Sequence, residues 1–90
     1  MTTVLWTFSA IADLEDIRSY IDAFNPSAAQ STASRLITAG DSLANFPGRG
    51  RAVRGTDLRE LIVIHPYIIR YRVEDDRVLI LRVRHGRRRP

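Results

Sequence analysis

Arginine recurs at every second position in two places near the C-terminal end of the sequence. The first pair is Arg70 and Arg72, and the second is Arg82 and Arg84. Because side chains alternate between the two faces of a β-strand, each pair projects from one side of its strand. A guanidinium group binds phosphate or carboxylate through two parallel hydrogen bonds. The spacing therefore predicts a sheet with an arginine-bearing face that meets an acidic or phosphate-rich partner.

The same region contains residues that could cleave RNA without a metal. Such cleavage needs a base for the 2′-hydroxyl, a cation for the developing charge and an acid for the leaving oxygen. Glu60 could act as the base, and His85 as acid or base, because histidine exchanges a proton near neutral pH. Arg70, Arg82 or Arg84 could stabilise the charge. The same residues also have purely structural interpretations. Glu60 and Arg70 can form a cross-strand ion pair, and His85 can be a histidine at the end of a strand.

Three short strands are expected to position these side chains, because three runs rich in β-branched and aromatic residues follow one another. They are Leu58–Ile64, Tyr67–Val73 and Val78–Arg84. A three-residue loop at the first connection places Glu60 opposite Arg70, whereas a two-residue loop turns the Glu60 carboxylate inward at a high cost. We therefore expect the three-residue loop.

A three-residue turn over residues 74–76 predicts the pairing of the last two strands. The expected pairs are Tyr71–Leu79, Ile69–Leu81 and Tyr67–Val83 on the buried face, and Arg72–Val78, Arg70–Ile80 and Ile68–Arg82 on the other face. Odd-numbered residues then form the core, and arginine alternates with aliphatic residues on the outer face.

The first half of the sequence predicts a strand and two helices. The strand covers Val4–Phe8, and Ser9 is the expected N-cap of a helix with apolar residues at helical spacing: Ile11, Leu14, Ile17, Ile21 and Phe24. Asn25 and Pro26 end this helix and begin a second one, which stops at Phe46–Gly48. The expected fold is α+β, with an N-terminal strand and an antiparallel αα-hairpin packed on one face of a mainly antiparallel sheet of three or four strands.

Composition restricts the class of protein. Ninety residues, 44% of them hydrophobic, make one globular domain over residues 1–90, with a basic flexible tail at 86–90. The absence of cysteine excludes disulfides and thiol chemistry. The N-terminus lacks the pattern of a signal peptide and no apolar run is long enough to span a bilayer, so we expect a cytoplasmic protein without membrane contact. The net charge of +4 comes with fourteen arginines and no lysine.

Six stretches form a recognisable pattern over nearly the whole chain. They are Trp6, Ser9–Ile21, Asn25–Ala29, Gly48–Arg51 with Leu58–Leu61, Tyr67–Val73, and Val78–Arg88. Together they resemble the RelE/ParE superfamily of small bacterial toxins from type II toxin–antitoxin modules, and most closely its ParE-like branch. The resemblance implies a growth-inhibiting toxin that is neutralised by a cognate antitoxin. We expect no cofactor and no metal.

Two activities occur in the superfamily. ParE-like members inhibit DNA gyrase, whereas RelE-like members cut mRNA on the ribosome. The sequence lacks the central lysines of RelE-like nucleases, has Ile68 where they carry an arginine, and continues from His85 into Gly86 and arginines. These departures favour gyrase inhibition over the alternative, an mRNA endonuclease.

A third possibility is a basic nucleic-acid-binding module, although operator DNA is expected to be contacted only through the antitoxin. The residues expected to face the target or the antitoxin are Arg49, Arg51, Arg59, Arg70, Arg72, Arg82, Arg84 and Arg87.

Overall fold

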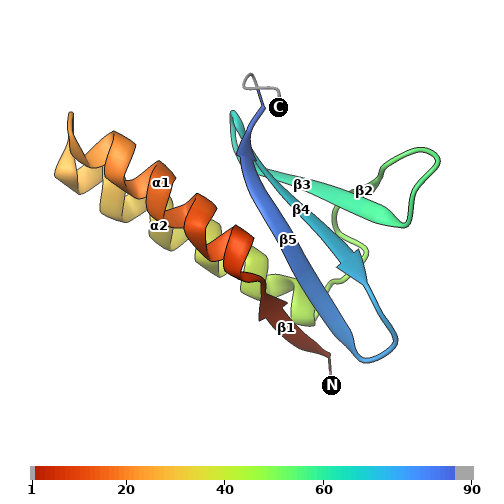
Figure 1. Cartoon of the computed structure of the whole chain (residues 1–90). Helices are drawn as coiled ribbons and strands as arrows, with labels where there is room; N and C mark the ends of the chain where they lie inside the picture. The colour runs from red at the N-terminus through yellow and green to blue at the C-terminus, as the bar shows by residue number, and fades with distance from the viewer. Residues whose placement is uncertain (1, 87–90) are drawn as a thin grey trace.

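The computed structural model describes residues 2–86, which form two layers, with two helices packed on one face of a five-stranded sheet (Figure 1). The elements are β1 (Thr3–Trp6), α1 (Phe8–Asp22), α2 (Pro26–Asp41), the 3-10 helix η1 (Ser42–Ala44), β2 (Arg51–Ala52), β3 (Leu58–Ile64), β4 (Tyr67–Val73) and β5 (Arg77–His85). The strand order is β1-β5-β4-β3-β2, with β1 parallel to β5 and the other pairs antiparallel. The predicted α+β fold is confirmed, and the N-terminal strand β1 joins the sheet as its fifth strand.

Residues 87–90, with Arg87 and most of the predicted basic tail, lie outside the described part of the chain. Within residues 2–86, no helix is long and apolar enough to cross a membrane.

Thr7 is the N-cap of α1, so the predicted cap at Ser9 is wrong. The Thr7 hydroxyl accepts a hydrogen bond from the Ala10 N–H at 3.1 Å and donates one to the Leu81 carbonyl oxygen at 3.1 Å. Its own N–H donates to the Ile80 carbonyl oxygen at 3.1 Å. One residue thus ends the pairing of β1 with β5 and starts the helix, which is why the strand stops earlier than predicted.

The apolar stripe predicted for α1 is only partly buried. Leu14 and Ile17 pack against the core, and Ala10 is completely buried. Ile11 and Phe24 are 46% and 76% exposed. The helix contacts the sheet mainly through β5 at one side, so only a narrow strip of its surface is covered.

The second helix begins as predicted, with Asn25 accepting a hydrogen bond from the Ala28 N–H and Pro26 in the first turn. It packs closely on the sheet at Gly40, where a Cβ atom would collide with Trp6 and would lie 2.9 Å from Ile80. Glycine at this position therefore allows the backbone of α2 to contact side chains of β1 and β5 directly.

The connection between β4 and β5 covers residues 74–76 as predicted, but the register differs by one residue, because the Glu74 N–H donates to the Arg77 carbonyl oxygen. Tyr71 consequently pairs with Ile80 rather than with Leu79. A slip of one residue exchanges the two faces of a strand. Val78 and Ile80 are accordingly fully buried, and the prediction that odd-numbered residues form the core is wrong for this part of β5.

A bulge at Leu81 returns the end of β5 to the predicted face, where Val83 is 2% exposed. The observed cross-strand pairs on the open face are Arg70–Arg82, Ile68–Arg84 and Arg72–Leu79. The predicted alternation of arginine with aliphatic residues is therefore wrong at Arg70, which lies opposite another arginine.

Glu60 lies opposite Arg70 as predicted, although the loop that leads there differs. Ile64 pairs with the first residue of β4, so the connection is the two-residue loop His65–Pro66. An irregularity around Val63 shifts the register by one residue and keeps Glu60 on the face away from the helices. The pairing is confirmed and the three-residue loop is wrong.

Tyr71 connects the loop after η1 to the sheet through two hydrogen bonds. Its side chain is fully buried, and its hydroxyl donates to the Pro47 carbonyl oxygen and accepts from the Gly50 N–H, both at 2.8 Å. A Cβ atom on Gly50 would lie 2.7 Å from the Tyr71 oxygen and 2.9 Å from the Glu60 carbonyl oxygen. Glycine is therefore required for this close approach.

We predict that Gly50→Ala lowers the free energy of unfolding by about 1–3 kcal/mol, because the added methyl group overpacks a buried contact. Gly48→Ala is the matched control, since no atom lies within 4 Å of its Cβ position. That variant should not lower stability, because alanine restricts the unfolded chain. Denaturant unfolding of both variants measures the difference, and equal stabilities would contradict the packing role of Gly50.

Candidate functional site

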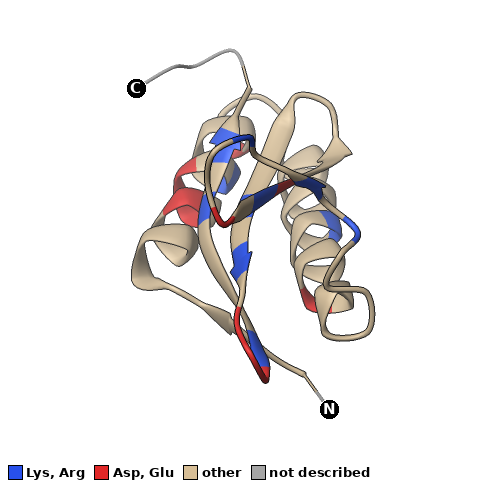
Figure 2. Ribbon diagram, turned by 90° about the vertical axis from the view of Figure 1, so that its right-hand side faces the viewer, with Lys and Arg blue, Asp and Glu red and all other residues tan. Residues whose placement is uncertain are grey.

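A row of charged side chains crosses the face of the sheet that the helices leave open. In the strand register, Arg51 of β2 lies opposite Glu60 of β3. Glu60 lies opposite Arg70 of β4, and Arg70 lies opposite Arg82 of β5. Asp13 of α1 stands at the end of the row, beside Arg82. Figure 2 shows the resulting alternation of basic and acidic segments across the strands.

Glu60 and Arg70 form a close ion pair. The Glu60 Oε2 accepts hydrogen bonds from Arg70 Nε at 3.0 Å and from Nη2 at 2.6 Å. The Glu60 side chain is 15% exposed and that of Arg70 38% exposed. The carboxylate is thus largely removed from water and already occupied by its neighbour.

Arg82 is held by a side chain from the first helix. Asp13 accepts hydrogen bonds from Arg82 Nε at 2.8 Å and Nη2 at 3.1 Å, and from the Val83 N–H at 2.9 Å. The hydrogen bond to this carboxylate raises the pKa of Arg82. No sequence pattern predicts this contact, because Asp13 lies on the polar side of an amphipathic helix and 69 residues away from Arg82.

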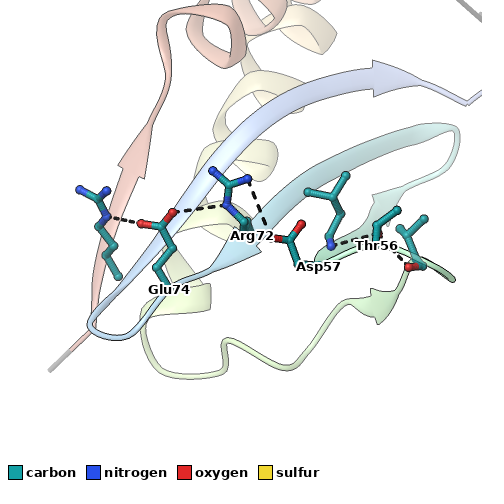
Figure 3. A network of polar contacts seen from close by, with 7 residues as sticks. Thr56, Asp57, Arg72 and Glu74 are labelled. Atoms are coloured by element: carbon teal, nitrogen blue, oxygen red, sulfur yellow. Dashed lines mark hydrogen bonds and ion pairs between the residues drawn. The ribbon is translucent and has the colours of Figure 1, made fainter.

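Arg72 belongs to a second polar network near the β4–β5 turn (Figure 3). Its Nε donates to Glu74 at 3.3 Å, and its guanidinium lies 4.0 Å from Asp57. Glu74 also accepts from Arg77 at 2.6 Å, and this hydrogen bond lowers the pKa of Glu74. Arg72 is therefore shared between carboxylates of two different connections.

Arg84 differs from the other arginines of the open face. Its Nε atom is buried and finds no hydrogen-bond partner among the described residues. It lies opposite the aliphatic Ile68. Arg84 thus carries a buried hydrogen-bond donor that residues 2–86 leave unsatisfied, and its guanidinium forms no ion pair among those residues.

His85 and Glu60 lie on opposite faces of the sheet. His85 follows the buried Val83 by two positions, so its side chain points toward the helix side, where its ring packs edge-on against Tyr67 at 5.5 Å. Glu60 neighbours the buried Leu61 and points the other way. The two candidate acid–base residues are therefore not brought together.

The remaining arginines of the predicted binding set do not join the row on the open face. Arg59 donates to the Gly50 carbonyl oxygen at 2.7 Å, and Arg49 donates to the Ser42 hydroxyl at 3.0 Å, both near the loop after η1. Most of the charges on the open face are thus already paired within the protein.

The chain is similar over most of its length to proteins described as toxins. A family model described as the ParE toxin of the type II toxin-antitoxin system parDE matches residues 4–90. Toxin RelE2 of Caulobacter vibrioides is 56% identical over 88 residues, which cover 98% of this chain and 99% of that protein. Toxin RelE3 of the same organism is 34% identical over 77 residues, covering 82% and 83%.

Two solved structures are similar in fold and in sequence. A chain of the chromosomal ParDE TA system from P. aeruginosa superposes with a TM-score of 0.84 at 25% identity and covers 94% of this chain and 96% of that chain. A chain of the toxin-antitoxin complex RelBE2 from Mycobacterium tuberculosis gives a TM-score of 0.66 at 25% identity, with coverage of 93% and 96%.

The helical hairpin on a five-stranded sheet is thus the fold of RelE/ParE superfamily toxins, as the sequence resemblance implied. The chain belongs to the ParE toxin family of type II toxin–antitoxin systems. Relatives named RelE and relatives named ParE both match, so family membership defines a toxin without defining its target.

We predict that Asp13→Ala lowers the free energy of unfolding by about 2–3 kcal/mol, because it removes charge-assisted hydrogen bonds and leaves the Val83 N–H without an acceptor. The matched control is Asp16→Ala on the same helix, an exposed residue without a side-chain contact among those described. It should change stability by no more than about 0.5 kcal/mol. If denaturant titrations give equal losses for the two variants, Asp13 does not anchor α1 to β5.

Proposed function

We propose that this toxin arrests growth by inhibiting DNA gyrase and that a cognate antitoxin neutralises it in the cytoplasm. The observation that supports gyrase inhibition over RNA cleavage is the position of Glu60 and His85 on opposite faces of the sheet. General acid–base cleavage requires both groups within hydrogen-bond reach of one phosphodiester. A protein that acts by binding has no such requirement.

The state of Glu60 supports the same proposal. Its Oε2 atom accepts two hydrogen bonds from Arg70, so the carboxylate is held in a cross-strand ion pair. Arg82, a candidate for stabilising negative charge, is likewise occupied by Asp13. A nuclease would have to break both ion pairs to assemble its site.

A second candidate function is ribosome-dependent cleavage of mRNA. Arg84 favours it, because its guanidinium forms no ion pair among residues 2–86 and could bind a phosphate oxygen of a substrate. The 56% identity to a toxin named RelE2 is compatible with it too.

The antitoxin is proposed to cover the open face of the sheet with an acidic, amphipathic segment. Apolar side chains lie among the arginines of this face, and Ile62 is 54% exposed. An amphipathic partner can bury such side chains while its acids meet the guanidinium groups. The structural relatives include a ParDE system and a RelBE2 complex, in which a toxin and an antitoxin occur together.

The gyrase proposal is tested by two assays on one purified sample. We predict that the toxin inhibits DNA supercoiling by gyrase, does not cleave mRNA on ribosomes, and loses its inhibition when the antitoxin is added in equal amount. Supercoiling gels and primer extension on ribosome-bound mRNA measure the two activities. Cleavage of mRNA without inhibition of gyrase would replace the first proposal by the second.

The role of the open face is tested at Arg84. We predict that Arg84→Gln weakens antitoxin binding about tenfold or more, because a hydrogen bond to a charged group contributes about 1.5–3 kcal/mol. Arg54→Gln serves as the control, since Arg54 is exposed, lies in the loop after β2 and makes no side-chain contact among the described residues. Calorimetric titration gives both affinities, and equal affinities would place the antitoxin elsewhere.

A further inference from the structure

Two arginines gather at a second place, beside α2 and away from the open face of the sheet. Arg35 of α2 and Arg49 of the loop after η1 line one cavity of about 310 Å³. The hydroxyl-bearing residues Ser34, Thr38 and Ser42 line it as well. Two cations and three hydroxyl groups thus line one open depression of the surface.

The charges in this cavity are not neutralised from within the protein. No acidic residue lines it in the described part of the chain, and neither Arg35 nor Arg49 forms an ion pair there. Among residues 2–86 the Arg49 guanidinium donates to the Ser42 hydroxyl at 3.0 Å, which in turn donates to the Ala39 carbonyl oxygen at 2.6 Å. This chain of hydrogen bonds holds the Arg49 guanidinium in place while its other N–H groups stay available to a ligand.

An apolar cavity adjoins the charged one. It measures about 570 Å³ and shares Ser42 and Arg49 with it, and it adds Phe46 and Gly48. Phe46 is 65% exposed, as the other two phenylalanines of the chain, Phe8 and Phe24, are exposed too. The open space around Gly48 leaves the ring accessible. An exposed aromatic ring beside a cation is the arrangement that stacks a nucleic-acid base.

We propose that the two cavities bind one nucleotide unit, with its phosphate held by Arg35 and Arg49 and its base stacked on Phe46. A guanidinium pair with hydroxyl donors suits the several oxygens of a phosphate. A carboxylate-rich peptide would satisfy the arginines but would leave the Phe46 ring exposed. The site goes beyond gyrase inhibition and antitoxin binding, and does not depend on either.

The binding experiment uses the ¹⁵N-labelled full-length chain and follows its amide resonances during titration with adenosine monophosphate, inorganic phosphate, adenosine, a hexamer of adenylate and hexaglutamate. Adenosine monophosphate should shift the amides of Gly48 and Val63 and bind more tightly than phosphate or adenosine alone. Binding of the mononucleotide indicates a free nucleotide as the ligand. Binding of the hexamer alone, with the same dependence on the variants below, indicates a nucleotide within a strand.

Two variants separate the two halves of the site. Arg35→Gln should weaken the binding of adenosine monophosphate and of phosphate, whereas Phe46→Leu should weaken only the nucleotide, about fivefold or more, through loss of stacking. Both side chains are exposed, so both variants should fold, and Arg54→Gln should bind like the parent. Equal weakening by Arg54→Gln, no effect of Phe46→Leu, absence of nucleotide binding, or tighter binding of hexaglutamate at the same amides would each overturn the proposal.

Discussion

Arg70 and Arg82 lie directly opposite each other on neighbouring strands, an arrangement that is repulsive unless each charge is matched. Glu60 of β3 forms an ion pair with Arg70, and Asp13 of α1 forms an ion pair with Arg82. Both carboxylates are about 15% exposed or less, so little water competes for them. The stability of the central strand pair therefore depends on one acid from each side, and one of them comes from outside the sheet.

This requirement explains how the helical layer is attached to the sheet. β1 pairs with β5 only as far as Ile80, and the edge of β5 continues beyond it. Thr7 takes the Leu81 carbonyl oxygen and Asp13 takes the Val83 N–H, so the start of α1 completes the edge that β1 leaves open. An edge strand covered in this way cannot recruit another strand. The contacts of Asp13 that neutralise the charge of Arg82 therefore also determine how α1 lies on β5.

The alternation of residues along a strand predicts which face each side chain occupies as long as the strand is regular. The prediction fails after a residue is inserted into the strand. Alternation along β4 correctly placed Tyr71 in the core, because that strand is regular. In β5 the bulge at Leu81 changes the face in mid-strand, and nothing in an apolar run marks the inserted residue. At the first connection, a shorter loop and an irregularity around Val63 cancel, so the pairing of Glu60 was predicted correctly for an incorrect reason.

The candidate site was harder to predict than the fold, because a count of arginines does not show which of them have partners. Arg70, Arg72 and Arg82 are bound to acids of the same chain. A partner that used Arg82 would have to release Asp13 and leave the Val83 N–H unsatisfied, which costs the free energy of both interactions.

An arginine that has no acidic partner within the protein can bind another molecule at a lower cost in free energy, because no native contact has to break. Arg84 fits this condition on the open face, where its Nε lacks an acceptor among the described residues. Arg35 fits it beside α2, where no acid lines the cavity in the described chain. The paired arginines then act mainly by fixing the strands on which the unpaired ones stand. Binding by this toxin should accordingly depend on a few unpaired cations more than on its net charge.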